Sequence, residues 1–320
     1  MAITVNAQTI ALHSSTGVQI LKGSTALVNA YSAAQNGDTL YLSGGTFAAP
    51  AAFDKQLMVF GAGHFVDSTL ATGKTFINGS VTLSENADLF YIEGVEITGG
   101  FTFIDNQSVN NVVVKRCKIN GLFNVQGALS TPSLNLALLE NVFVNALYLN
   151  NAQNAMVSNC IIQLNIAWSQ GNIISNNIIL FPSAYSLHDC HNNQINNNIF
   201  LGSAISQGTG NIYNNNLFVS ASPAYGTTAT VFNSYTGIVQ SSIFVNQTGN
   251  VFDYSHDYHL QNPLTYTGTN NTQIGLYGGI FPIKEGAVPL NPHIQVKNIA
   301  PTTDANGNLL IQIQVGAQNE

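Results

Sequence analysis

The chain has 320 residues and a formal net charge of −7, and only 7% of its residues are charged, against about 25% in an ordinary soluble domain. With 8 Lys and Arg in all, it lacks the basic surface that binds phosphates, so we expect no nucleic-acid partner. The 45% of hydrophobic residues exclude a disordered chain. Asn, with 41 copies, takes the place of charged residues, and it favours turns over helices.

The first residues, MAITVNAQTIALHSS, contain neither a basic segment nor an apolar run, so they do not read as a signal peptide. Two expectations follow. The chain is an extracellular or cell-surface protein whose leader was removed, or it is assembled inside a cell and belongs to a virion. No membrane span is expected, because polar residues interrupt even the uncharged stretch 141–187.

A helix is predicted near the N-terminus, over Ser24–Asn36. Leu27, Tyr31 and Ala34 recur there at helical spacing, with Ser24 as the expected N-cap and Gly37 as the stop. An amphipathic helix in this place is suited to cover the first coil of a solenoid.

The middle of the chain repeats a short unit that begins at residues 92, 114, 139, 157, 174, 195, 213 and 239. Each unit reads apolar, polar, polar, small or Asn, any, apolar, which predicts two short strands joined by a bend. Steps near 20 residues without room for a helix indicate an all-β fold, a β-solenoid of roughly ten stacked coils.

Two predicted core columns follow from this alignment. The first contains Ile92, Val114, Leu139, Val157, Ile174, Ile195, Tyr213 and Val239. The second contains Ile97, Ile119, Val144, Ile162, Ile179, Phe200, Phe218 and Phe244. An inward column between them contains Cys117, Val142 and Cys160, so these thiols are expected to be buried and reduced. A neighbouring column of Asn141, Asn159, Asn176, Asn197 and Asn215 is expected to form an asparagine ladder at the bends.

The cysteines give no other signal. Cys117, Cys160 and Cys190 make an odd count with no CxxC spacing, so neither a disulfide framework nor a metal site is expected.

The C-terminal part leaves the repeat. We place the β-helix with its N-terminal cap at residues 1–285 and a tail at 286–320. Two alternating segments around PTTDANGN predict a β-hairpin over Ile294–Gln318. This hairpin is expected to cap the last coil or to pair with another chain, giving a homo-oligomer or filament.

The units VSNCII, ISNNII and INNNIF, with GDTLYLSGGTF and FGAG, resemble right-handed parallel β-helix proteins of the pectate-lyase-like superfamily. The segment DYHLQNPLTYTGTNNTQIGLYGG resembles the closing segment of bacterial secreted β-helix repeat proteins, although Gln273 stands where an acid is usual. The superfamily includes polysaccharide lyases, glycoside hydrolases, phage tailspikes and non-catalytic adhesins. The fold alone does not choose among these functions.

A lyase of this type needs a Lys or Arg base and usually Ca²⁺, and the catalytic candidates are Lys115 and Arg116. The alignment also explains them structurally. It places Lys115 between Glu93 and Glu140, and Lys118 beside Glu96, as a cross-strand charge ladder on the solvent face. No cofactor is expected, and Ca²⁺ would enter only with lyase activity.

A hydrolase needs two carboxyl groups about 5 to 9.5 Å apart. Between Glu140 and Asp253 the only acidic residue is Asp189, so the middle coils supply no such pair. Asp189 lies with His188 and His191 in SLHDCHNN and is the third catalytic candidate. The segment is either a loop that binds a polar ligand or an ordinary Asx turn.

Aromatic residues are further ligand-binding candidates, because sugar rings stack on exposed aromatic faces. Trp168 is expected to be the most exposed, and Tyr185 lies in the following loop. Phe101, Phe123 and Tyr148 fall at equal offsets and are expected to form an internal aromatic column.

A second His- and Asp-containing segment, DYSHDYHL at 253–260, is expected to place His256 and Asp257 on opposite faces of a strand, which disfavours one compact site.

From the low charge and the missing acid pairs we expect a non-catalytic extracellular surface, adhesion or fibre protein that contacts a polysaccharide or cell-surface glycan. The alternatives are a polysaccharide lyase or glycoside hydrolase, and a phage tail fibre or spike.

Overall fold

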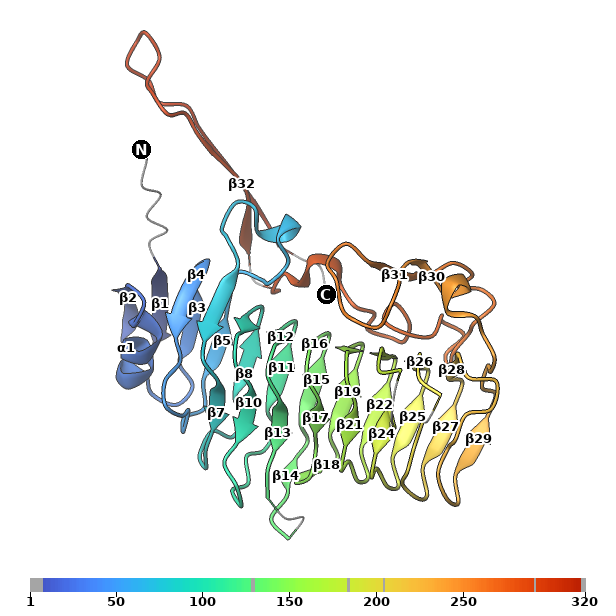
Figure 1. Cartoon of the computed structure of the whole chain (residues 1–320). Helices are drawn as coiled ribbons and strands as arrows, with labels where there is room; N and C mark the ends of the chain where they lie inside the picture. The colour runs from blue at the N-terminus through green and yellow to red at the C-terminus, as the bar shows by residue number, and fades with distance from the viewer. Residues whose placement is uncertain (1–7, 128–129, 183–184, 204, 291, 318–320) are drawn as a thin grey trace.

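The computed structural model describes residues 8–127, 130–182, 185–203, 205–290 and 292–317. It is a mostly β structure, a β-solenoid of about nine turns whose coils stack through parallel sheets (Figure 1). Short strands separated by bends give three sheets that run along the solenoid, here named A, B and C. The predicted fold class is confirmed.

Sheet A has twelve strands. In spatial order they are β2 (Gly17–Lys22), β1 (Thr9–Ser14), β3 (Thr39–Leu42), β5 (Met58–Phe60), β8 (Tyr91–Glu93), β11 (Val113–Lys115), β15 (Ala137–Leu139), β19 (Met156–Ser158), β22 (Ile173–Ser175), β25 (Gln194–Asn196), β27 (Ile212–Asn214) and β29 (Thr230–Phe232). From β3 onward, neighbouring strands pair in parallel.

Sheets B and C are also parallel. Sheet B contains β4 (Gly45–Ala48), β6 (Thr75–Asn78), β9 (Glu96–Ile97), β12 (Lys118–Ile119), β16 (Val142–Phe143), β20 (Ile161–Ile162), β23 (Ile178–Ile179), β26 (Ile199–Phe200) and β28 (Leu217–Phe218). Sheet C contains β7 (Val81–Leu83), β10 (Phe101–Phe103), β13 (Phe123–Val125), β17 (Leu147–Tyr148), β21 (Ile166–Ala167) and β24 (Leu187–His188). A minor pair joins β14 (Ser133–Leu134) to β18 (Ala152–Gln153).

The predicted columns hold except in two units. Val157 and Ile174 are adjacent in parallel register, as expected. In the unit at 137–144, Val114 pairs with Leu138 and not with Leu139, so the alignment is wrong by one residue there. The last unit is also wrong, because Tyr213 pairs with Val231 and not with Val239.

The one-residue correction places Asn141 between the two buried cysteines. The backbone N–H of Cys117 donates to Asn141 Oδ1, and the backbone N–H of Asn141 donates to Cys160 Sγ. All three cysteines are free, and Cys117 and Cys160 are buried, as predicted. Cys190 is buried as well, and burial raises the pKa of each thiol to about 12.

Asparagines play two separate roles at the bends. Inside the solenoid, Asn177, Asn198 and Asn216 donate and accept along the stacking direction, amide to amide. The column predicted from the sequence lies on the outside of the bends. Its members Asn159, Asn176, Asn197 and Asn215 have φ between 53° and 60°. Asn tolerates this left-handed conformation better than most residues, which explains why so many bends of this chain contain an asparagine. Asn159 and Asn215 donate instead to carbonyl groups of the C-terminal segment.

The N-terminal cap is more elaborate than expected. Helix α1 (Ala26–Ala33) is shorter than the predicted Ser24–Asn36, and Thr25, not Ser24, is its N-cap. Lys55 Nζ donates to the carbonyl groups of Tyr31 and Ala34 at the helix C-terminus, where a cation is favourable. The hairpin β1–β2 pairs antiparallel onto β3, and with α1 it covers the first coil.

The C-terminal segment returns along the solenoid. Residues 238–290, here called the strap, contain η2 (Gln240–Ser242), the antiparallel pair β30 (Phe244–Asn246) and β31 (Asp257–Leu260), and η3 (Glu285–Ala287). The strap lies over sheet B (Figure 1), where Leu260, Ile274 and Leu276 pack on outward apolar side chains of that sheet. A third short helix, η1 (Asp67–Thr69), lies in the loop after β5.

The predicted hairpin is confirmed as β32 (His293–Ile299) and β33 (Ile311–Gly316), which pair antiparallel. It projects away from the coils and does not cap the last one (Figure 1).

Candidate functional site

The basic cluster is part of a buried ion-pair network. Arg116 is 1% exposed and lies 3.0 Å from Glu93 and 2.9 Å from Glu140, while its Nη1 also donates to the Val288 carbonyl of the strap. The predicted ladder is right in placing Glu93 opposite Lys115. It is wrong on the other side, where Leu139 and not Glu140 lies opposite Lys115, and both carboxylates are buried and not on the solvent face. Glu140 falls at the bend beside Arg116, and both have positive φ.

This arrangement occupies both basic catalytic candidates. Lys115 Nζ lies 3.5 Å from Glu140, and the Arg116 guanidinium is enclosed by two carboxylates and the strap. The neighbouring bend residue Gly94 (φ 73°) lies under Pro289, where a Cβ would approach the proline ring to 2.3 Å. The strap thus closes directly over the network.

A second ion-pair group confirms the other predicted contact. Lys118 Nζ lies 3.1 Å from Glu96, and Lys74 Nζ lies 2.5 Å from it on the opposite side. Burial acts to raise the pKa of the Glu96 carboxyl, but bonds from Lys74, Asn120 and Lys118 outweigh it and lower the pKa to about 2.

This shift predicts a pH dependence of stability. The unfolded carboxyl has a pKa of about 4.3, so Glu96 stabilises the fold fully above that pH and loses the effect as the pH falls toward 2. We expect Glu96→Gln to lower the urea midpoint most at neutral pH, with a difference from the wild type that shrinks below about pH 4. Glu85→Gln, at an exposed position, is the control and should leave the pH profile unchanged.

The ligand-binding candidates gather on sheet C. Trp168 is 37% exposed, as expected for the most accessible of the aromatic candidates, and it lies 4.5 Å from the Tyr148 ring and 6.0 Å from the His188 ring. The three side chains come from successive coils, so they form a row along the solenoid axis, here called the sheet C row. Tyr185 lies in the loop before β24 and is not part of this row.

The expected aromatic column is correct for two of its members. Phe101 and Phe123 are buried and stacked at 5.1 Å. Tyr148 does not join them, because Phe123 pairs with Leu147 and leaves Tyr148 one residue further along, beside Trp168.

Asp189 and His191 lie next to the row. Asp189 has a positive φ of 50°, and its Oδ1 lies 3.0 Å from His191 Nε2. The other ring nitrogen of His191 contacts Thr209 Oγ1 at 3.0 Å. Both side chains stay partly exposed, at 53% and 34%, so this pair offers polar groups beside the aromatic row. Among the described residues no three His, Cys, Asp or Glu side chains are grouped to hold a metal ion.

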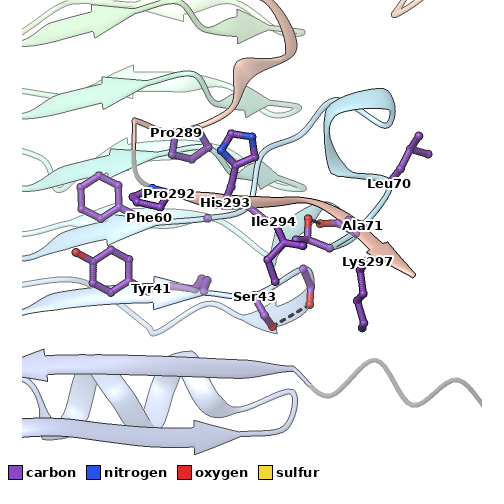
Figure 2. A pocket seen from close by; sticks show the side chains of 16 residues that line it. Tyr41, Ser43, Phe60, Leu70, Ala71, Pro289, Pro292, His293, Ile294 and Lys297 are labelled. Atoms are coloured by element: carbon purple, nitrogen blue, oxygen red, sulfur yellow. Dashed lines mark hydrogen bonds between the residues drawn. The ribbon is translucent and has the colours of Figure 1, made fainter. Parts of the chain in front are cut away.

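A crevice of about 660 Å³ lies where the tail meets the first coils. Figure 2 shows Pro289, Pro292 and His293 beside Phe60, with Tyr41 below. The Tyr41 and Phe60 rings stack at 5.5 Å, and the described residues that line the crevice include no carboxylate. The base of the projecting hairpin and apolar side chains of sheet A therefore line one crevice together.

No family description, curated protein or solved structure matches the chain. In the described part of the chain no helix is long and apolar enough to cross a membrane.

Proposed function

We propose that this protein is a non-catalytic β-helix surface, adhesion or fibre element, extracellular or on a virion, that contacts a polysaccharide or cell-surface glycan. The sheet C row carries the proposal. Tyr148, Trp168 and His188 come from successive coils, and the exposed Trp168 ring lies nearly perpendicular to its two neighbours, at 73° and 83°. Asp189 and His191 supply polar groups beside them. Aromatic platforms flanked by hydrogen-bonding groups are suited to sugar rings.

We also propose that the chain is related to the pectate-lyase-like superfamily and its bacterial secreted members, which its repeat units resemble. A lyase or hydrolase is the alternative, and two observations argue against it. Lys115 and Arg116 are both engaged by carboxylates, and the strap covers sheet B over most of its outward apolar face. The proposed protein needs no cofactor.

The test is binding on a glycan array with the full chain, followed by titration of each positive glycan. Trp168→Ala is expected to weaken binding about tenfold or more, or about 1.4 kcal/mol, because an exposed aromatic anchor is lost. Phe281→Ala, an exposed aromatic residue of the strap, is the matched control and should bind as the wild type does. A reducing-sugar and unsaturated-product assay on the same glycans should show no cleavage. Release of unsaturated products that stops in Arg116→Lys would overturn the non-catalytic proposal.

We further propose that the hairpin joins copies of this chain. Ile311, Ile313 and Val315 alternate along β33 and share one face, and each is more than half exposed. Ile299 and Ile294 pair with Ile311 and Val315 and extend this face, whereas Lys297 pairs with Ile313 and places one charge between them. A two-stranded ribbon is marginally stable alone in water. Packing against the same face of a second copy would bury its apolar side chains and stabilise it.

This proposal predicts a mass change in solution. Light scattering should give an oligomer for the wild type and a monomer for Ile313→Lys, because a second lysine opposite Lys297 repels it and opposes burial of the face. Gln312→Lys places the same charge on the opposite face, and it should leave the mass unchanged. A monomeric wild type would contradict assembly through the hairpin.

A further inference from the structure

A cavity of about 460 Å³ lies beneath the N-terminal-facing end of the strap. Its floor contains Val142 and Ile161 of sheet B, one wall is the loop that carries His64 and Asp67, and the remaining walls belong to strap residues 252–258 and 276–287. This volume falls within the range of small-molecule sites, about 300–1,000 Å³.

The lining concentrates negative charge. Five of the 15 acidic residues of the chain line the cavity, whereas Lys284 is the only Lys or Arg among the described residues of the lining. The five are Asp67, Glu140, Asp253, Asp257 and Glu285. In a chain with 7% charged residues, this density is far above the average for the surface. The lining therefore favours a positively charged occupant.

The carboxylates are spread out and do not converge. Glu140 is committed to Arg116, and Asp257 accepts from the amide and Nδ1 of His259. Asp67, Asp253 and Glu285 are exposed at the rim. No three acidic or His side chains in the described part of the chain are grouped as metal ligands. This separation suits an organic cation, which meets carboxylates at several edges, better than a metal ion, which needs them around one point.

Aromatic rings supply the rest of the wall. Phe65, Phe252 and Tyr254 pack edge to face, with ring centroids 4.9 Å apart for the two contacts of Tyr254. Tyr258 and Tyr277 line the cavity as well. Lys74 and Lys118 already lie over the Tyr254 ring, 5.0 and 5.1 Å from its centroid. An ammonium group is therefore attracted by the rim carboxylates, and the aromatic wall offers apolar surface to the rest of the ligand.

His64 gives an independent sign of a ligand. It is fully buried and lines the cavity, its Nδ1 lies 3.3 Å from Tyr254 Oη, and its Nε2 has no hydrogen-bond partner among the described residues. Burial lowers the pKa of the imidazole to about 3, so the ring is neutral and does not repel a cation. Buried polar atoms are nearly always paired, and a ligand hydroxyl or amine would pair this one.

We propose that the strap cavity binds a small organic ammonium compound, an amine carried on a sugar or on a short alkyl body. This site is independent of the sheet C row and of the glycan proposed there. The ammonium contacts the rim carboxylates Asp253 and Glu285, and the body packs on Tyr258 and Tyr277.

Isothermal titration of the full chain at low salt tests this proposal with four probes: glucosamine, N-acetylglucosamine, glucose and n-butylamine. Glucosamine and glucose differ only in the amine, so binding of glucosamine at least tenfold tighter than glucose or N-acetylglucosamine supports an ammonium site. Tighter binding of glucosamine than of n-butylamine identifies the sugar as the body, and the reverse order identifies an alkyl body. Equal binding of glucosamine and glucose, or no binding of either amine, overturns the proposal.

Variants locate the binding. Asp253→Asn with Glu285→Gln should weaken amine binding at least tenfold, whereas Asp304→Asn, an exposed carboxylate in the hairpin turn, should not change it. Trp168→Ala should also leave amine binding unchanged, which separates this site from the sheet C row. Amine binding that survives the double substitution would place the site elsewhere and contradict the proposal.

Discussion

Arg116→Ala is expected to lower the free energy of unfolding by about 3–5 kcal/mol, because it leaves two buried carboxylates without their cation. Glu93 is fully buried and Glu140 is 7% exposed, and Arg116 also holds the strap through the Val288 carbonyl. Denaturant titration followed by circular dichroism measures the change. Lys115→Ala is the neighbouring control, and it should cost only about 0–1 kcal/mol because its single contact is longer and more exposed.

Two further variants separate charge from backbone strain. Arg116→Asn keeps a residue that tolerates the left-handed conformation, so a loss equal to that of Arg116→Ala would assign the effect to the missing charge. Adding Glu93→Gln and Glu140→Gln to Arg116→Ala should recover part of the loss, because the carboxylates are then neutral. If Arg116→Ala costs no more than Lys115→Ala, the network is not a stabilising element.

The repeat could be recognised from the sequence because each coil must point apolar side chains inward at the same places. Ile92, Val114 and Val157 satisfy this condition in a single way. The segment LALLENVFV satisfies it in two ways, because Leu138 and Leu139 are adjacent and equally apolar. The alignment that matched Asn141 to the outer bend asparagines was the wrong one, since Glu140 takes that bend and pairs with Arg116.

That single slip accounts for three errors. It placed Glu140 opposite Lys115 on the solvent face, it placed Val142 and not Asn141 between the cysteines, and it placed Tyr148 inside the core. In each case a polar or aromatic side chain was assigned to the wrong face, because one residue of register reverses every side chain of a strand.

The sequence contains a signal that something covers the outer face of sheet B. Outward residues of sheet B are Val142, Ile161, Ile178, Ile199 and Leu217, each next to an inward apolar residue. A sheet that is apolar on both faces must be covered on both. What covers it could not be predicted, because the strap has no repeat and contacts coils far away in sequence. Tyr254 and His64, which meet across the strap cavity, are 190 residues apart.

The second large effect concerns the inner asparagines. Asn198→Ala is expected to lower the free energy of unfolding by about 2–6 kcal/mol, because it strips partners from two buried backbone groups at about 1–3 kcal/mol each. Asn198 Nδ2 donates to the Ile174 carbonyl, and its Oδ1 accepts from the Asn177 amide, both across neighbouring coils. Alanine supplies neither partner, and the enclosed site is fully buried.

Denaturant midpoints of three variants test this role. Asn196→Ala, half-buried on the same coil, should change stability by no more than about 0.5 kcal/mol. Asn198→Cys should cost less than Asn198→Ala, because Cys160 occupies the same column and its Sγ contacts the Leu138 carbonyl at 3.3 Å. The order Asn196→Ala, Asn198→Cys, Asn198→Ala in increasing cost supports hydrogen bonding along the coils as the reason for asparagine in this column. Equal costs for Asn196→Ala and Asn198→Ala would show that the column is selected by bend geometry alone.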